Sequence, residues 1–245
     1  MSDDDEPETR HHFSEGSGFG DPYEGFDLDP PELDVDTSLV DPVDDHVLPD
    51  LLDERQLRRA DVDAAALVEV GLNYMGINRY EQATEAFERA ARYADDGATR
   101  QEAWVNKGVA HAQLEEYDDA IGAYREALHV DDDGEFAADA HTNLAYALWE
   151  FGEDEQAFRH AERAVTLDPR LPQAWYNLGF IEVERGLHED ALECLDNAIR
   201  LGFRGAAVYE EKVRALEALD REEEAEAAAE RAEEIRERVE DELVR

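Results

Sequence analysis

The sequence predicts an all-α protein, a right-handed superhelical solenoid of five helix-turn-helix repeats that follows a disordered acidic N-terminal tail. Two motifs and one periodicity carry this prediction. In Trp175-x-x-Leu178-Gly179, spacings of three and four place two apolar side chains and a glycine on one helical face. After a break at Gly186, residues 191–198 build a second such face from alanine and leucine. A single helix pair buries only one side, so it requires neighbours.

The neighbours are present at a nearly fixed period. A shift of 34 residues back from Gly179 leads to Ala145, and two further shifts of 37 lead to Gly108 and Gly71. A shift of 34 residues forward leads to Val213. Around each of these places lie apolar residues at helical spacing, and an alanine-containing amphipathic stretch follows. Copies in register along most of the chain are the signature of stacked helical repeats.

These motifs resemble the tetratricopeptide repeat (TPR) family over residues 64–239. The resemblance implies five repeats, at residues 64–100, 101–137, 138–171, 172–205 and 206–239, with 240–245 as the end of the last helix. Three residues depart from the family pattern: Glu182 stands at an aromatic place, Phe203 replaces the closing proline, and Ala161 replaces a large residue. None of them breaks the helical phase, so the fold prediction stands while the local superhelix geometry stays open.

Two segments precede the repeats. Residues 1–46 are acidic and rich in glycine and proline, without a helical or alternating period, and are predicted to be disordered. Residues 47–63 are predicted to form a short helix that begins near Pro49 and caps the first repeat. The tail is either a plain solvating appendage or a segment that occupies a groove of the repeats, in cis or in trans within a homodimer. The second reading depends on its spaced aromatic residues, Phe13, Phe19, Tyr23 and Phe26.

Charge is the most extreme feature of the composition. The chain has 65 acidic and 23 basic residues, for a net charge of −42, and its only lysines are Lys107 and Lys212. This composition resembles that of proteins from salt-accumulating extreme halophiles. A disordered acidic chain is the alternative, but a hydrophobic fraction of 42% and the helical periodicity argue against it. The acidic surface also disfavours nucleic acid as a partner, because phosphate binding depends on Lys and Arg.

The location expected from the sequence is the cytoplasm. Residues 1–5 include three aspartates, the reverse of a signal peptide, and no apolar run approaches the roughly 20 residues that cross a bilayer. We therefore expect no membrane association. Cys194 is the only cysteine, so it has no partner for an intramolecular disulfide.

No enzymatic activity, metal or cofactor is expected. The sequence has no nucleophile elbow, no zinc-protease motif and no phosphate-binding glycine loop. The run Asp131-Asp132-Asp133-Gly134 resembles part of a calcium loop. However, alignment of its glycine puts His129 and Ala140 where carboxylates are required, so an acidic turn is the better interpretation.

A candidate binding surface lies on the first helix of each repeat. Residues rotated away from the repeat core should be polar in a purely structural array, yet many of them are apolar or aromatic. The resemblance to TPR proteins implies that this face lines a concave, peptide-binding groove. Packing between adjacent repeats is the alternative, and it is expected for Met75, Trp149 and Val183. The candidate groove residues are Val68, Leu72, Val105, Asn106, Val109, Asn143, Tyr146, Trp149, Tyr176, Asn177 and Phe180.

The asparagines strengthen this interpretation. Asn106, Asn143 and Asn177 recur at one place in three successive repeats, and TPR proteins that hold extended peptides use asparagines there. An amide suits the role because it both donates and accepts hydrogen bonds. The TPR subgroup that clamps a terminal carboxylate uses several basic residues instead, so no carboxylate clamp is expected. At the corresponding places this chain has Ala65, Glu102, Asp139, Thr142 and Gln173.

The predicted function is an adaptor or assembly factor that binds a peptide or unstructured segment of a protein partner in an apolar, asparagine-lined groove. One alternative is a structural self-association module without an outside ligand, assembling through the Leu67 side of the first repeat or through residues 228–239. Another is an accessory subunit of an enzyme. At molar salt the Debye length is about 3 Å, so recognition is expected to depend on apolar burial and hydrogen bonds.

Overall fold

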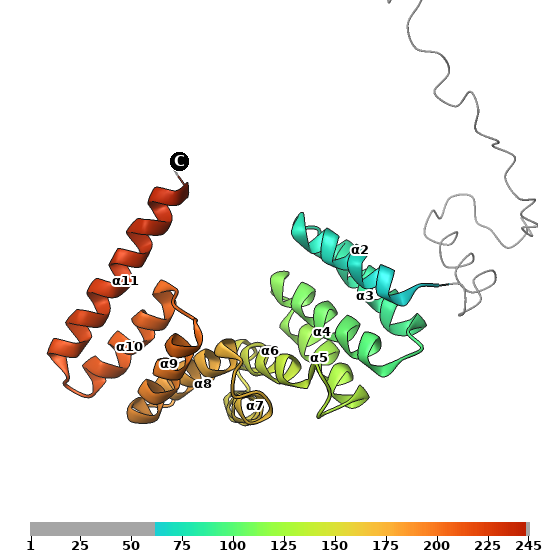
Figure 1. Cartoon of the computed structure of the whole chain (residues 1–245). Coiled ribbons are helices and arrows are strands. Elements are labelled where there is room, and N and C mark those ends of the chain that lie inside the picture. The colour runs from blue at the N-terminus through green and yellow to red at the C-terminus, as the bar shows by residue number, and fades with distance from the viewer. Residues whose placement is uncertain (1–61, 244–245) are drawn as a thin grey trace, which may run out of the picture. The chain divides into compact units, whose positions relative to one another are not determined.

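The computed structural model describes residues 62–243, and these residues form α-helices and short turns only (Figure 1). The chain divides into two units, Met1–Gln56 and Leu57–Arg245, and all described residues belong to the second. The predicted tail and residues 47–61 of the predicted capping helix lie outside the described residues. The helices are α2 (Ala64–Gly76), α3 (Tyr80–Tyr93), α4 (Gly97–Gln113), α5 (Tyr117–Val130), α6 (Ala137–Glu150), α7 (Asp154–Leu167), α8 (Pro172–Glu184), α9 (His188–Leu201), α10 (Ala206–Ala218) and α11 (Glu222–Leu243).

The helices pack as consecutive pairs, which confirms the all-α repeat prediction. Extensive contacts join α2 with α3, α4 with α5, α6 with α7, α8 with α9 and α10 with α11. The second helix of each pair also contacts the first helix of the next pair. Helix α4 begins at Gly97, four residues before the second predicted repeat, because the Asp96 carboxylate accepts a hydrogen bond from the Thr99 backbone N–H (2.8 Å) and caps the helix there. No described helix combines the length and apolar character that a membrane span requires.

A small residue on the first helix allows each close-packed pair to form. A Cβ atom added to Gly71 or Gly108 would overlap the ring of Phe87 or Tyr124, which lies 16 residues further along the chain. At Gly179 the added atom would lie 2.9 Å from Leu195 Cγ. In the third repeat both members of the pair are alanine, Ala145 and Ala161, and both are completely buried. In the first, second and fourth repeats, a glycine leaves space for a large side chain on the second helix. In the third repeat, the methyl group of Ala145 takes up part of that space, which explains why a small residue, Ala161, stands opposite it.

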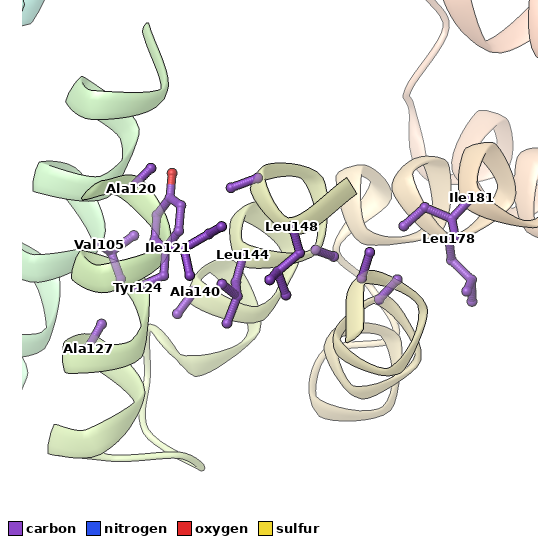
Figure 2. Packing of buried hydrophobic residues seen from close by; sticks show 14 of the residues in the cluster. Val105, Ala120, Ile121, Tyr124, Ala127, Ala140, Leu144, Leu148, Leu178 and Ile181 are labelled. Carbon is purple, nitrogen blue, oxygen red and sulfur yellow. The ribbon is translucent and has the colours of Figure 1, made fainter. Parts of the chain in front are cut away.

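The buried side chains form a continuous series of clusters along the repeats. The largest passes from α4 and α5 through α6 and α7 to α8 and α9, and Figure 2 shows part of it, with Tyr124, Leu144 and Leu178. A second cluster joins α8 and α9 to α10 and α11. A third joins α2, α3 and α4. From the second repeat on, each first helix therefore contributes to the core of its own repeat and to the junction with the preceding one.

Both lysines lie at such junctions. The Lys107 ammonium of α4 contacts the Glu88 carboxylate of α3 (Nζ–Oε2 2.9 Å), and Lys212 of α10 contacts Asp196 of α9 (Nζ–Oδ1 2.5 Å). The two pairs occupy equivalent places in their repeats. At the equivalent places in the third and fourth repeats stand Leu144 and Leu178, which are buried. Junctions between repeats are thus closed either by leucine or by a lysine–carboxylate pair.

Glu182, which stands where the family pattern has an aromatic residue, lies in the core between α8 and α9. It is 7% exposed, and within the described residues its Oε2 has no hydrogen-bond partner. Burial raises the pKa of its carboxyl from 4.5 to about 7, although a hydrogen bond from the Cys194 thiol opposes the shift. Burial, and then the neighbouring Glu182, also raise the pKa of Cys194. Burial and the raised pKa both disfavour the thiolate form of Cys194, which is the reactive form of cysteine.

The helix approach at Gly108 can be tested by adding one methyl group. Gly108→Ala is expected to destabilise the protein by about 1–3 kcal/mol, because the methyl overlaps the Tyr124 ring. Gly122→Ala is the matched control, since Gly122 lies in the middle of α5 with nothing within 4 Å of the added Cβ. That change should stabilise the protein by about 0.5–1 kcal/mol. Urea unfolding followed by circular dichroism measures both, and equal effects would contradict a close approach at Gly108.

Glu182 makes stability depend on pH. Because its pKa is raised in the folded state, the folded protein holds this proton more tightly than the unfolded chain. The contribution is therefore lost as the pH rises from 4.5 to about 7. Glu182→Gln should be more stable than the natural protein at pH 8, by up to about 3 kcal/mol, and the difference should shrink toward pH 4. Glu226→Gln, an exposed change in α11, should show no such trend in the same unfolding series.

Candidate functional site

The first helices form one layer. Helices α2, α4, α6, α8 and α10 contact one another in succession, whereas no two second helices pack together to a similar extent within residues 62–243. All of the candidate groove residues lie on α2, α4, α6 and α8 of this layer. The layer therefore brings residues of successive repeats side by side, although they are 34 to 37 positions apart in the sequence.

A pocket of about 440 Å³ opens on this layer and spans three repeats. Five of the candidate residues line it, namely Val109, Asn143, Tyr146, Tyr176 and Asn177. The remaining lining residues are Ala112, Gln113, Glu115, Tyr117, Tyr124 and Gln173. We call these eleven residues the groove pocket. Of the residues added by the structure, Glu115 and Tyr117 come from the turn between α4 and α5 and from the start of α5. A search restricted to first helices could not have found them.

The other candidate residues have different surroundings. Val68 and Val105 are 4% and 6% exposed and belong to the core clusters, so their side chains offer little surface to a ligand. Leu72 is 44% exposed on α2, outside the groove pocket. Trp149 and Phe180 pack edge to face, with ring centroids 4.6 Å apart, against the largest core cluster. The predicted alternative of packing between repeats therefore applies to Trp149.

The three asparagines do not form a uniform row. The Asn177 amide is buried and donates to the Thr142 carbonyl of the preceding repeat (3.0 Å), while its oxygen accepts a hydrogen bond from Gln173 (3.0 Å). Asn106 donates to the Glu102 carbonyl of its own helix (3.0 Å). Asn143 is half-buried, lines the groove pocket and has no side-chain hydrogen bond within the described residues. Asn143 is thus the amide best placed to bind the backbone of a ligand.

Aromatic rings form much of the wall. Tyr146 is 41% exposed, and its ring stacks on Trp149 with centroids 6.3 Å apart. Tyr176 stacks on Phe203 with centroids 4.6 Å apart. Phe203 replaces the closing proline of the family pattern, and here it packs behind a residue of the groove pocket. Ring-on-ring packing orders the two tyrosines before any ligand arrives.

The electrostatic environment of the groove pocket is negative. Burial, and then the neighbouring Glu150 and Glu115, raise the pKa of Tyr117. Burial followed by Glu150 likewise raises the pKa of Tyr146. The pKa of Tyr176 is also raised, first by burial and then by the carboxylates of Glu211 and Glu210. Each phenol resists ionisation partly because carboxylates stand near it.

The positions where TPR proteins with a carboxylate clamp have basic residues carry no positive charge in this protein. Burial raises the pKa of Glu102, with Glu135 and Asp96 as further causes. The pKa of Asp139 is raised by burial and then by Asp168. Arg214, on the first helix of the last repeat, is paired with Glu184 (2.5 Å) and Glu211 (2.8 Å). This polarity is opposite to that required to bind a terminal carboxylate.

One group of potential metal ligands lies outside the groove pocket. Ligand atoms of His111, Glu116 and Asp119 lie within 4.8 Å of one another, and His111 Nδ1 is 2.8 Å from Glu116 Oε2. The sequence did not reveal this group because its members come from α4, from the turn after it and from α5. Glu116 and Asp119 are exposed, and exposed carboxylates often gather without an ion, so no metal function is assigned to them.

Comparison with solved structures shows the same fold in several proteins. MamA is 20% identical, with a TM-score of 0.58 over 70% of this chain and 97% of that one. YrrB, described as a TPR protein with an unusual peptide-binding site, is 18% identical with a TM-score of 0.55, over 76% of this chain and 91% of that one. PilF of Pseudomonas aeruginosa is 22% identical with a TM-score of 0.61, over 70% and 75%. No curated protein sequence matches the chain.

The sequence itself matches models of one family. Three tetratricopeptide repeat models match residues 69–135, 138–181 and 172–201, which together cover more than half of the chain. The matched residues include the glycines and alanines that permit the close helix approach in the first four repeats. The structural neighbours share the fold. The chain therefore belongs to the tetratricopeptide repeat family.

Proposed function

We propose that this protein binds a peptide or an unstructured segment of a protein partner in the groove pocket, as an adaptor or assembly factor. The groove pocket itself carries this proposal, because it unites side chains from α4, α6 and α8 that no single repeat holds. A surface that crosses successive repeats suits an extended segment better than a compact ligand. TPR domains in general bind protein or peptide partners, which agrees with this proposal.

The mode of binding follows from the lining. Tyrosine faces and the aliphatic surface of Val109 and Ala112 supply apolar contact, and the Asn143 amide supplies hydrogen bonds. A partner with a free carboxylate would meet Glu102 and Asp139 instead of basic residues. We therefore propose internal segments, and not carboxyl termini, as ligands. Any enzymatic activity of a complex with this protein would belong to the partner, since TPR scaffolds are typically non-enzymatic.

Self-association is the second candidate, and one observation favours it. Val70 of α2 and Ile77, which follows the last residue of α2, are 42% and 62% exposed. In the later repeats, the residue equivalent to Val70 is the leucine or lysine at the junction with the preceding repeat. The route through α11 has less support, because Ala228 and Ile235 are already buried (7% and 5%). Val239 is the exposed apolar residue of that helix (48%). Light scattering of Val70→Ser with Ile77→Ser distinguishes a dimer formed through α2 from a monomer.

The groove can be tested with selected peptides. A random-peptide display selection at molar salt should enrich segments that bind the natural protein. Asn143→Ala with Tyr146→Ala should weaken their binding at least tenfold, because both residues line the pocket and Tyr146 is 41% exposed. Phe151→Ala is the control, since Phe151 is 56% exposed and outside the pocket. Calorimetric titration measures the affinities. Unchanged binding by the double variant would place the peptides elsewhere on the protein.

We also propose that the protein works at high salt. With a net charge of −42, the folded protein repels itself, and this repulsion grows as the Debye length rises from about 3 Å at 1 M salt to about 30 Å at 0.01 M. Removal of salt is therefore expected to lower the melting temperature. Helical circular dichroism between molar and millimolar potassium chloride checks this. The same melting temperature at both extremes would reject the halophilic interpretation.

A further inference from the structure

We propose that the groove pocket receives a cationic side chain, arginine or lysine, of the bound segment. This inference rests on the proposed function, since it specifies the chemistry of the partner at the same site. Three kinds of observation support it: the aromatic walls, the absence of positive charge among the lining residues, and the conformation of one glutamate at the rim.

The walls offer several aromatic faces around one space. Tyr117, Tyr146 and Tyr176 come from three successive repeats and line the same pocket. A cation over the face of an aromatic ring is attracted by the ring quadrupole, more strongly when both are withdrawn from water. Because Tyr146 stacks on Trp149 and Tyr176 on Phe203, these rings are held in place before binding. Little ordering of the site is then required when the ligand arrives.

The charges of the lining select the same class of ligand. Glu115 is the single charged residue among the eleven, and none of them is Lys, Arg or His. Glu150 and Glu211 stand close enough to raise the pKa values of neighbouring tyrosines. Arg214, a basic side chain near Tyr176, is occupied by two glutamates. An arriving guanidinium or ammonium group therefore meets carboxylates and no competing cation from the lining.

Glu115 is held in a conformation that its residue type disfavours. Five equivalent residues follow the first helices, and all have positive φ: Asn78 (58°), Glu115 (61°), Gly152 (88°), Gly186 (77°) and Asp220 (57°). Glycine, asparagine and aspartate are the residues that commonly adopt this region, whereas glutamate is not. The one exceptional residue is also the one charged residue that lines the groove pocket. Strain at a single member of a repeated set points to a role in binding.

This mode of binding is compatible with high salt. Screening acts most strongly on exposed charges that are separated by more than a Debye length. A cation seated among tyrosines lies in contact with them and is partly withdrawn from the solvent. The groove pocket can therefore discriminate by charge although the general surface charge of the protein cannot attract a partner from a distance.

The inference also bears on the tail of the chain. Residues 1–46 contain Arg10 as their one basic residue beside many acids. A segment of that composition is repelled by the carboxylates near the groove pocket. We therefore assign the pocket to a basic segment of another protein and not to Phe13, Phe19, Tyr23 or Phe26. Binding of the tail is one of the outcomes that the experiment below distinguishes.

Two small probes isolate the charge. N-acetyl-arginine amide carries a guanidinium group, and N-acetyl-citrulline amide has nearly the same shape without the charge. In nuclear magnetic resonance titrations of the full chain at 2 M potassium chloride, the arginine probe should shift signals of residues lining the groove pocket and bind at least fivefold more tightly. The gain of a cation–π contact, roughly 0.5–2 kcal/mol, corresponds to this range. Tyr146→Leu should remove most of the difference.

Glycine substitutions separate binding from stability. Glu115→Gly relieves the strained conformation and should raise the melting temperature, by on the order of 2–4 °C, while it weakens binding of the arginine probe severalfold. Asp220→Gly is the matched control, because Asp220 has the same conformation in the last repeat, away from the pocket. That variant should leave binding of the arginine probe unchanged.

Three results would overturn the inference: equal affinity for the two probes, unchanged binding in both Tyr146→Leu and Glu115→Gly, or displacement of the arginine probe from the groove pocket by a peptide of residues 13–30, a stretch without Arg or Lys. The peptide display selection distinguishes failure of the cationic-anchor inference from failure of the proposed peptide-binding function. Selected peptides that depend on Tyr146 but show no enrichment of Arg or Lys leave peptide binding standing and refute the cationic anchor.

Discussion

The approach of the two helices within each repeat is the constraint on which the rest of this structure depends. Gly71 and Gly108 leave space for Phe87 and Tyr124, so the ring of the second helix packs directly against the backbone of the first. This contact holds the two helices of a pair together, and the second helix of each pair then packs against the first helix of the next pair. A pocket that spans α4, α6 and α8 exists only because the pairs repeat this geometry. The third repeat keeps the close approach with two alanines instead of a glycine and a ring.

Much of the fold could be predicted because small residues that recur at a fixed period on one helical face indicate helices that pack closely in every repeat. Gly179 and its counterparts indicated the helix pairs without any knowledge of the three-dimensional structure. The candidate site could be predicted only in part. Val68 and Val105 were predicted to line the groove, but both are buried in the core clusters. The angle between repeats decides this, and it is not encoded in the period of one helix.

The rim of the groove pocket was missed for a related reason. Glu115 and Tyr117 lie beside Asn143 and Tyr146 only after two repeats have stacked. The one local signal was Glu115 itself, a glutamate at the place where other repeats have Asn, Gly or Asp. Asn177 lines the groove pocket, yet its amide also joins α8 to α6 through the Thr142 carbonyl. A repeated polar residue can therefore serve the junction between repeats as readily as a ligand.

The placement of the two lysines has a practical consequence. An amine-directed reagent finds lysine side chains in this sequence at positions 107 and 212 only, and each is held against a carboxylate of the preceding repeat, with 16% and 21% of the side chain exposed. The rate of modification at each site therefore reports how often that junction opens. The natural protein thus carries intrinsic probes of breathing at its first and last junctions, which can be followed by mass spectrometry without the introduction of any label.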